Sequence, residues 1–340
     1  MQRGPAIAID AMGGDRAPRE IVRGAILAAR QSPSVPLILA GDEAKVREEL
    51  EAGGWEGSNI EVVPSRCVID MGDSPVEAFR KKRGSSIEVA TRLVKEGRAF
   101  AVVGAGNTGA AVAASTLLLG VLPNVKKAGI AVSFATGDTR VVVIDVGANV
   151  YSKPEHLIQY GVMASLYARE ILGVESPRVG LLNIGEEDEK GNALAKTTHN
   201  LFQKTKLNFI GNVEGVEVFR GVCEVVVCDG FVGNILLKTA EGMAERLLGL
   251  FHHAVKRAVE SHPAGPDLAP SLREVVGEME RKLDYAEYGG APLLGVNGVT
   301  IIAHGRSDQR AILNAIRVAQ RMGEIDLNAR FSEELFALSA

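Results

Sequence analysis

The sequence predicts an α/β protein in which helices sandwich an open, mostly parallel sheet and a helical arm stands apart. Short apolar runs suited to buried strands lead into a turn and then an amphipathic helix, and this pattern occurs five times. Regular alternation of strands and helices is typical of parallel sheets. We expect a single domain over residues 1–340, with a helical hairpin arm at 235–290 and the tip of that arm at 261–270.

Length and composition indicate an ordinary soluble enzyme. The chain has 340 residues, of which 46% are hydrophobic and 24% charged, and its formal net charge is -4. This length allows a substantial core, and the mildly acidic balance argues against a nucleic-acid partner. Cys67, Cys223 and Cys228 lack C-x-x-C spacing, so we expect reduced thiols in a cytoplasmic protein. No apolar run approaches a membrane span, and the N-terminal residues do not resemble an export signal.

The elements are expected in a regular order along the chain. The first strand covers 6–10 and ends in a glycine turn at 10–15, and Pro18 then begins a helix that ends near Arg30. The clearest break lies at 261–270, where three prolines fall within eight residues. A helix pair joined there fits an arm for dimer contact or for touching a surface. The other strands are expected at 37–40, 60–63, 101–103, 130–133, 140–146, 179–184, 209–211, 225–228 and 299–303, and the other helices at 43–51, 73–83, 154–172, 235–259, 272–285 and 308–322, with two more beginning near 85 and 108.

The stretch 101–114 carries the strongest single signal. Apolar residues lead into a glycine loop, and an Ala-rich helix follows with Thr108 as its expected N-cap. Glycine lets a ligand approach the backbone, and the free N–H groups at a helix N-terminus favour an anion, most often phosphate. The residues of this loop expected to bind phosphate are Gly106, Asn107, Thr108 and Gly109.

Two other interpretations of this loop stay open. Gly104, Gly106 and Gly109 fit the G-x-G-x-x-G spacing of a nicotinamide-dependent dehydrogenase. That fold places a carboxylate about 20 residues further on to bind the ribose. Residues 124–129 contain no carboxylate, which argues against a dinucleotide. The third interpretation is a tight turn without a ligand.

Carboxylates and amides recur where the expected strands end. Ligands of open α/β sheets bind in the crevice outside the carboxyl ends of the strands, so we expect these side chains to contact substrate. In the first loop Asp10 and Asp15 could hold a loop amide, a metal or a substrate hydroxyl, and the alternative for Asp15 is that it only organises the turn before the helix. The candidates are Asp10, Gly13 and Gly14 after the first strand, Asp145 and Asn149 after the strand at 140–146, and Asp229 and Asn234 after the strand at 225–228.

Two further loops carry groups suited to handling charge. Residues 185–192 contain four carboxylates and Lys190, which stands beside Gly191 near the next helix start and could point toward an anion. No histidine accompanies these carboxylates, and we expect no metal there. His304, after the last strand, fits three roles equally: a base, a phosphate ligand, or a core histidine bonded to the backbone.

A run of four cations stands on an expected helix of this mildly acidic chain. Arg80, Lys81, Lys82 and Arg83 form either a solvated face or a docking surface for an acidic partner or a phosphate.

The chain shows no nucleophilic constellation. It has no G-x-S-x-G motif, no adjacent Cys and His, and no H-E-x-x-H. Glycine loops, amides, a lysine and carboxylates without a nucleophile indicate direct transfer between two bound substrates. The protein would then act by positioning them and stabilising charge.

Taken together, the loops closely resemble the bacterial phosphate acyltransferase family (PlsX), over residues 7–317. Several independent motifs occur in the family's order, which makes the resemblance specific. These motifs are 10–15, 105–110, 145–149, 180–187, 209–215, 227–234 and 303–305.

The resemblance implies transfer of a fatty acyl chain from acyl carrier protein to inorganic phosphate, an early step of phospholipid (phosphatidic acid) biosynthesis. The products are acyl phosphate and free carrier protein. It also implies a fold similar to isocitrate and isopropylmalate dehydrogenases and phosphotransacetylases, and a cytoplasmic homodimer loosely associated with the inner face of the cell membrane. It implies neither a metal nor a nucleotide cofactor. Tyr151 departs from the family, which usually has an acidic residue there. A non-catalytic scaffold that binds acyl carrier protein is the remaining alternative.

Residues and resemblance together suggest a mechanism. We expect phosphate at a glycine loop and helix N-terminus, with its charge offset by Lys190 and Arg306. A phosphate oxygen attacks the thioester carbonyl, and backbone N–H groups with the amide of Asn234 or Asn107 stabilise the oxyanion. His304 could protonate the leaving thiolate, and the run 80–83 is the expected docking surface for the carrier.

Overall fold

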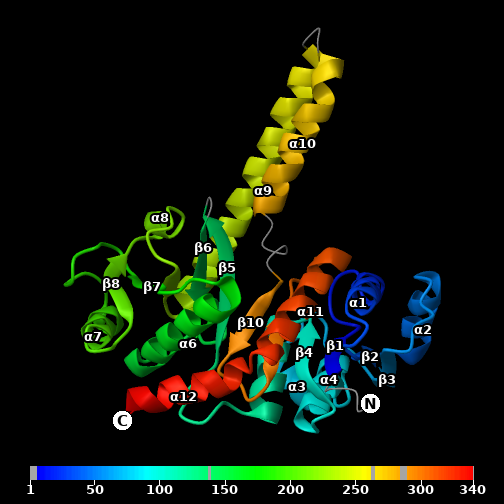
Figure 1. Ribbon diagram of the computed structural model, residues 1–340, viewed down its shortest axis with the longest axis horizontal. Helices are drawn as coiled ribbons and strands as arrows, with labels where there is room; N and C mark the ends of the chain where they lie inside the picture. Colours follow the sequence, from blue (N-terminus) through cyan, green and yellow to red (C-terminus); the bar gives the residue numbers. More distant parts are fainter. Residues whose placement is uncertain (1–5, 137–138, 262–264, 284–288, 340) are drawn as a thin grey trace.

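A computed structural model describes residues 6–136, 139–261, 265–283 and 289–339. The described strands form one open sheet, helices pack on both of its faces, and two long helices extend from the body as an arm (Figure 1). In sheet order the 11 strands are β3 (Ile60–Pro64), β2 (Leu37–Gly41), β1 (Ala6–Asp10), β4 (Ala99–Gly104), β11 (Val299–Ile302), β10 (Ala291–Leu294), β5 (Gly129–Thr136), β6 (Thr139–Ile144), β9 (Val225–Val227), β7 (Arg178–Leu182) and β8 (Asn208–Val213).

The sheet is parallel in both halves and antiparallel in the middle. β1 pairs in parallel with β2 and β4, and β9 pairs in parallel with β6 and β7. The antiparallel contacts join β11 to β10, β10 to β5 and β5 to β6. The expected fold class is therefore confirmed. The sequence does not predict β10, because that strand has only four residues and contains Pro292.

Alternate residues of the central strands enter two different cores, which is why helices cover both faces. Ile7 and Ile9 of β1 lie in one core, and Ala8 between them lies in the other. The first core is covered by α1 (Arg19–Gln31), α6 (Pro154–Leu172), α11 (Gln309–Glu324) and α12 (Leu327–Ser339), and the second by α3 (Pro75–Lys81), α4 (Ser86–Lys95) and α5 (Thr108–Ala114). The remaining helices are α2 (Glu43–Ala52), α7 (Ala193–Phe202), α8 (Gly215–Val218), α9 (Gly230–Ser261) and α10 (Gly265–Leu283), and a π-helical turn, η1 (Ser115–Leu119), continues α5.

The start of α9 differs from the sequence-based expectation. The helix begins at Gly230 rather than near 235. Asp229 causes the early start, because its Oδ1 accepts hydrogen bonds at 3.0 Å from the N–H groups of Phe231 and Val232. As a result, Asn234 lies within the helix rather than in the loop before it.

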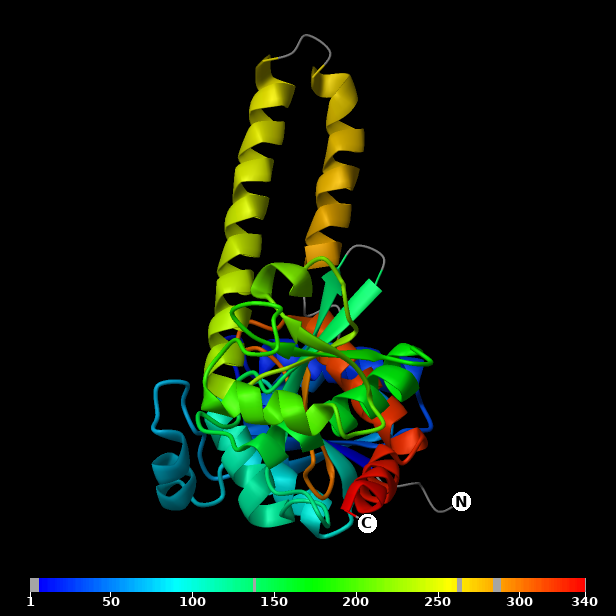
Figure 2. The ribbon, with the colours of Figure 1, turned by 90° about the vertical axis from the view of Figure 1, so that its left-hand side faces the viewer.

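The arm consists of α9 and α10, which extend together from the body (Figures 1 and 2). α10 begins at Gly265 inside the proline-rich segment, since Pro266 occupies the first turn, where proline is tolerated. Of the expected mobile tip at 261–270, residues 262–264 lie outside the described part of the chain. Within the described ranges, no helix has the length and apolar character needed to cross a membrane.

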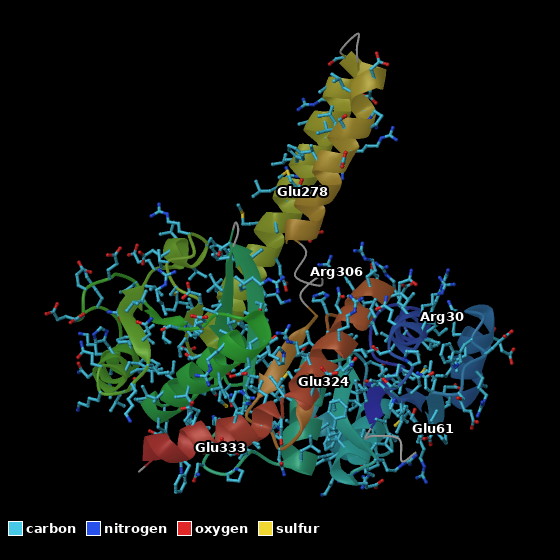
Figure 3. The ribbon with its side chains drawn as sticks, viewed as in Figure 1. Arg30, Glu61, Glu278, Arg306, Glu324 and Glu333 are labelled. Atoms are coloured by element: carbon cyan, nitrogen blue, oxygen red, sulfur yellow. The ribbon has the colours of Figure 1, made fainter. Side chains whose placement is uncertain are left out.

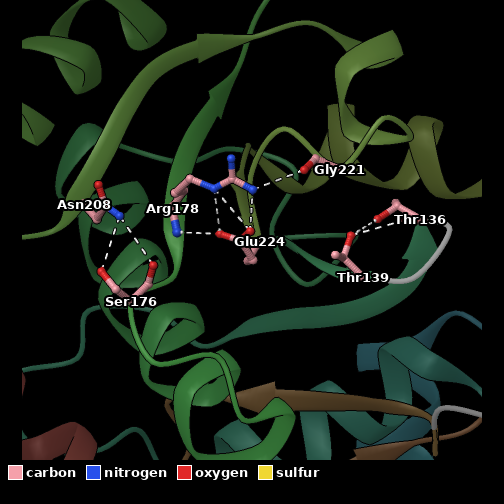
Figure 4. A network of polar contacts seen from close by, with 7 residues as sticks. All are labelled: Thr136, Thr139, Ser176, Arg178, Asn208, Gly221 and Glu224. Carbon is pink, nitrogen blue, oxygen red and sulfur yellow. Dashed lines mark hydrogen bonds and ion pairs between the residues drawn. The ribbon is translucent and has the colours of Figure 1, made fainter.

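An ion pair joins β7 to β9 at the start of both strands. The Arg178 guanidinium contacts the Glu224 carboxylate at 2.6 Å, and the backbone N–H of Arg178 donates to the same carboxylate at 2.8 Å (Figure 4). Burial acts to raise the pKa of Glu224, but the hydrogen bonds from Arg178 outweigh it and leave the pKa below its usual value. The pair is strong because the acceptor is charged and receives several donors.

We predict that Glu224→Gln lowers the free energy of unfolding by about 1–2 kcal/mol at neutral pH. Because the pKa of Glu224 is lowered in the folded state, its stabilisation is present above about pH 4.5 and is lost as the pH falls through the folded-state value. Urea unfolding at pH 7 and at about pH 3 should show the difference shrinking in acid. Glu61→Gln, at an exposed pair with Arg98, is the control and should cost less than about 0.5 kcal/mol. An equal loss of unfolding free energy in both variants would show that the Arg178–Glu224 pair is no stronger than an exposed ion pair.

Candidate active site

The loops that follow β1 and β4 touch one another. Asp10, at the end of β1, is buried, and its Oδ1 accepts hydrogen bonds at 3.1 Å from the N–H groups of Met12 and Gly13. A Cβ on Gly13 would lie 2.7 Å from the backbone nitrogen of Gly106, so glycine is required for this contact. Burial raises the pKa of Asp10, and the two N–H bonds oppose that effect. Asp10 therefore holds loop amides, one of the roles that the sequence left open for it.

The loop after β11 joins the same cluster. Gly14 has a φ of +114°, and a Cβ there would lie 3.2 Å from the carbonyl oxygens of both Ala105 and Gly305. The N–H of Asp15 donates to the carbonyl of Gly305 at 2.8 Å. Three loops from neighbouring strands are thus packed backbone to backbone beside the N-terminus of α5.

The N-cap of α5 is Asn107, so the prediction that Thr108 caps this helix is wrong. Asn107 Oδ1 accepts a hydrogen bond from the N–H of Ala110 at 3.0 Å, so Thr108 is the first residue of the helix. The Asn107 side-chain N–H groups donate to the carbonyls of the preceding segment 70–73. All of its polar atoms are therefore used to hold the loop, which removes Asn107 as an oxyanion donor. Gly109 packs against Pro75, with 2.5 Å between a hypothetical Cβ and the proline ring.

Asp145 organises the loop after β6 in the other half of the sheet. Its side chain is fully buried, and Oδ1 accepts hydrogen bonds at 2.9–3.1 Å from the N–H groups of Ile130, Gly147 and Ala148. Oδ2 accepts from both the backbone and side-chain N–H groups of Asn149. Burial raises the pKa of Asp145, and these hydrogen bonds oppose the shift. With both oxygens occupied, Asp145 acts on the loop and not directly on a ligand.

Asn149 is likewise committed to structure. Its side-chain amide donates to the carbonyl of Ala128 at 2.6 Å and to the hydroxyl of Tyr160 at 2.9 Å, besides Asp145. Its own carbonyl accepts the N–H of Gly230 at 3.0 Å, which ties the β6 loop to the first turn of α9.

This tie places Asn234 beside the β6 loop. A Cβ on Gly233 would lie 1.9 Å from the carbonyl oxygen of Asp145, so the first turns of α9 press directly on that strand end. Gly147, with a φ of +137°, faces the Asn234 side chain at 3.5 Å from a hypothetical Cβ. The Asn234 side chain itself is exposed and forms no hydrogen bond with the described part of the chain.

One cleft connects the two halves of the sheet. Thr108 from the start of α5, His304 from the loop after β11 and Asn234 from α9 all line it, so the cleft brings together three of the predicted site residues. Its cavity volume is about 110 Å³, and its walls are mainly apolar. The other lining residues are Ile130, Val132, Ser133, Val146, Leu237, Lys238, Glu241, Gly290, Ala291, Ile302 and Ala303.

The position of the hydrogen on His304 follows from its backbone contact. Nδ1 accepts the N–H of Arg306 at 3.1 Å, so in the neutral ring Nε2 carries the hydrogen. Burial lowers the pKa of His304, helped by Lys238 and Arg306 and opposed by Glu241. The imidazole is therefore neutral at pH 7 and acts as a hydrogen-bond donor through Nε2.

Comparison with known proteins identifies the family. A family model described as "Fatty acid synthesis protein" matches residues 6–330. A phosphate acyltransferase from Desulforamulus reducens is 49% identical over 97% of this chain and 97% of the relative. Another, from Halothermothrix orenii, is 46% identical over 92% of this chain and 93% of its own length. This chain belongs to the phosphate acyltransferase family.

Solved structures show the same fold. A phosphotransacetylase from Streptococcus pyogenes superposes with a TM-score of 0.61 over 95% of both chains at 16% identity. The EutD phosphotransacetylase from Staphylococcus aureus gives a TM-score of 0.58 over 94% of both chains at 17% identity. At such identities the likeness concerns the fold alone, and it agrees with the sheet described above.

Lys190 and Arg306 lie outside the lining of the cleft. The Lys190 ammonium is 3.8 Å from the carboxylate of Glu187. The backbone carbonyl of Lys190 accepts a hydrogen bond from the side-chain N–H of Asn183, which follows β7. Arg306 follows His304 by two residues and pairs at 3.7 Å with Glu245 of α9. Figure 3 shows Arg306 near the base of the arm.

Most of the basic run is paired with carboxylates. Lys82 Nζ contacts Asp73 at 2.6 Å and Asp70 at 2.7 Å, and these contacts raise the pKa of Lys82 to about 12. Lys81 pairs with Glu77, and Arg83 lies 3.8 Å from Glu88. α3 ends at Lys81, so Lys82 and Arg83 lie beyond the helix, which was expected to reach residue 83. Of the four cations, Arg80 alone makes no ion pair with the described residues.

Lys238 and Glu241 also line the cleft, although neither is among the site residues predicted from the sequence. They form an ion pair at 2.8 Å on the same face of α9 as Asn234. Positions 234, 238 and 241 follow the spacing i, i+4 and i+7 of one helix face. If the sequence is assigned a helix that begins directly after Asp229, this spacing predicts that both residues face the same side as Asn234.

We predict that Asp145→Asn destabilises the protein by about 3 kcal/mol. The new amide turns a donor toward N–H groups that need an acceptor, and it does so in a fully buried position. Asp229→Asn is the matched control: an asparagine still accepts the N–H groups at the start of α9, so the change should stay within about 0.5 kcal/mol. Denaturant unfolding of both variants measures the difference. Equal stability of Asp145→Asn and wild type would show that the carboxylate does not hold the loop.

Proposed function

We propose that the protein transfers a fatty acyl chain from acyl carrier protein to inorganic phosphate, yielding acyl phosphate and free carrier protein. The observation that supports it most is the cleft, where a helix N-terminus, a free amide and a neutral imidazole face one small space. Membership of the phosphate acyltransferase family supports the same reaction.

Phosphate binds at the start of α5, beside Thr108 and the packed glycine loops. The free N–H groups there and the helix dipole favour an anion, and η1 extends the helical run. Lys238 supplies positive charge from the opposite wall, with Glu241 fixing its position. Arg306, two residues after His304, adds positive charge beside the cleft, whereas Lys190 lies outside its lining.

The reaction is a direct displacement at the thioester. A phosphate oxygen attacks the carbonyl carbon, the carbonyl oxygen becomes an oxyanion, and the C–S bond then breaks to release the carrier's thiolate. The side-chain N–H of Asn234 donates to the oxyanion, and the Nε2 hydrogen of His304 donates to the oxyanion or to the departing sulfur. Hydrogen-bond donors held in place in a mainly apolar cleft stabilise the oxyanion more than the same donors would in water.

The arm supports a homodimer. Met243, Leu247 and Leu250 of α9 are each at least half exposed and lie on one side of the helix. A second copy covering this apolar stripe would bury it. Leu268, also exposed, stands near the tip of α10 and supports peripheral contact of that end with the inner face of the cell membrane.

Removal of the Asn234 amide should lower kcat by about 10²-fold or more, the usual effect of losing one oxyanion donor. The measurement is release of free thiol from acyl carrier protein on addition of phosphate. Asn208→Ala is the control, because Asn208 lies at the start of β8 and contacts Ser176. Carrier binding without thiol release from the wild type would favour a non-catalytic scaffold, and a wild-type rate in Asn234→Ala would remove Asn234 from the mechanism.

The pH profile should report His304. Because burial lowers its pKa, the ring is protonated only below pH 6.5, and protonation at Nδ1 breaks the contact with the Arg306 N–H. We expect kcat/KM to fall on the acid side of that value. In His304→Gln, whose amide does not titrate, the rate should drop about 10²-fold, and the part of the acid limb that is due to His304 should disappear. Because phosphate titrates as well, the effect of His304 is the difference between the kcat/KM profiles of the wild type and the variant. Identical acid limbs would exclude His304.

A further inference from the structure

We propose that five arginines beside the cleft form the docking surface for the acidic carrier protein. This inference rests on the proposed function and adds the place where the carrier binds. We call the surface the arginine patch; it consists of Arg16, Arg19, Arg23, Arg306 and Arg310.

Close packing of α1 against α11 gathers the patch. A Cβ on Gly24 would lie 2.5 Å from Cβ of Ile312, so the Ile312 side chain of α11 packs directly on the glycine of α1. The Glu20 carboxylate accepts the N–H of Gln309 at 3.0 Å and ties the start of α11 to α1. Both helices therefore begin side by side at the same edge of the sheet (Figure 1).

The patch adjoins the cleft through the loop that carries His304. Arg16 follows Gly14 by two residues, and Arg306 follows His304 by two residues. Both loops are joined by the hydrogen bond from Asp15 to Gly305. A carrier seated on this surface would present its thioester directly at the cleft.

The patch keeps a net positive charge. Arg16, Arg19 and Arg23 form no ion pair with the described residues, and Arg16, Arg19, Arg306 and Arg310 are exposed. Four carboxylates lie nearby. That of Glu245 pairs with Arg306 at 3.7 Å, those of Glu20 and Asp308 accept backbone N–H groups at the start of α11, and Asp15 is the fourth. In a chain of net charge -4, five arginines against four carboxylates leave a locally basic surface.

The run 80–83, favoured by the sequence, fits this role less well. Three of its four cations already have carboxylate partners, and Lys82 has two. An acidic partner would have to displace those contacts, whereas the arginines of α1 are available. Complementary charge at a rim accelerates encounter and orients the partner.

The decisive experiment reverses charge on each surface. Arg16→Glu combined with Arg19→Glu should raise KM for the acyl carrier protein thioester by about tenfold or more and leave kcat near wild type. Activity with a neutral acyl-N-acetylcysteamine thioester, which lacks the carrier, should not change. Arg80→Glu combined with Lys81→Glu is the matched control and should leave both KM values unchanged. Arg23→Glu alone tests the same surface should the double variant fail to fold.

The outcomes separate the docking surface from the reaction itself. No thiol release by the wild type would overturn the proposed function. An active wild type with an unchanged KM in both patch variants would overturn the docking surface alone, as would a raised KM in the control instead. Sedimentation with phosphatidylglycerol vesicles completes the test: if the patch variants lose vesicle binding and keep their KM for the carrier, the arginines contact lipid and the proposal is wrong.

Discussion

The buried carboxylate of Asp145 is the interaction on which the site depends. It collects N–H groups from the loop 147–149 and from β5, and its own carbonyl lies against Gly233 of α9. A carboxylate without these donors could not remain in a dry interior. Because the loop is fixed in this way, Asn149 can tie down the first turn of α9, and Asn234 and Lys238 then face the cleft. Asp10 performs a similar task at the end of β1, where the glycine loops meet.

The fold could be predicted from the sequence because its signals are local. Apolar runs, glycine turns and helix caps recur at each unit, and α6 has the bounds that its pattern predicts. The individual roles could not be predicted, since a carboxylate or amide at a strand end looks the same in the sequence whether it binds a ligand or holds a loop. Asn107 and Asp145 are of the second kind, and only their hydrogen-bond partners, some of them far along the chain, reveal it.

The ion-pair partners of the cations could not be predicted from the sequence either, because they too depend on tertiary contacts. The partners of Lys82 are Asp70 and Asp73, which reach it only because the segment between them folds back over the start of α5. Conversely, Arg19 and Arg310 are almost 300 residues apart in sequence, and the packing of α1 on α11 brings the helices that carry them together. Local composition therefore indicated the basic run 80–83, whereas tertiary packing builds the arginine patch.

We propose above all that phosphate occupies the cleft between Thr108, Asn234 and His304. Arsenate has the shape and charge of phosphate and scatters X-rays anomalously, so crystals of the full chain grown with arsenate locate the anion directly. We expect one anomalous peak within hydrogen-bonding distance of the Thr108 N–H and the Lys238 ammonium, and its loss in Lys238→Met. A peak elsewhere, with the cleft empty, would contradict the account.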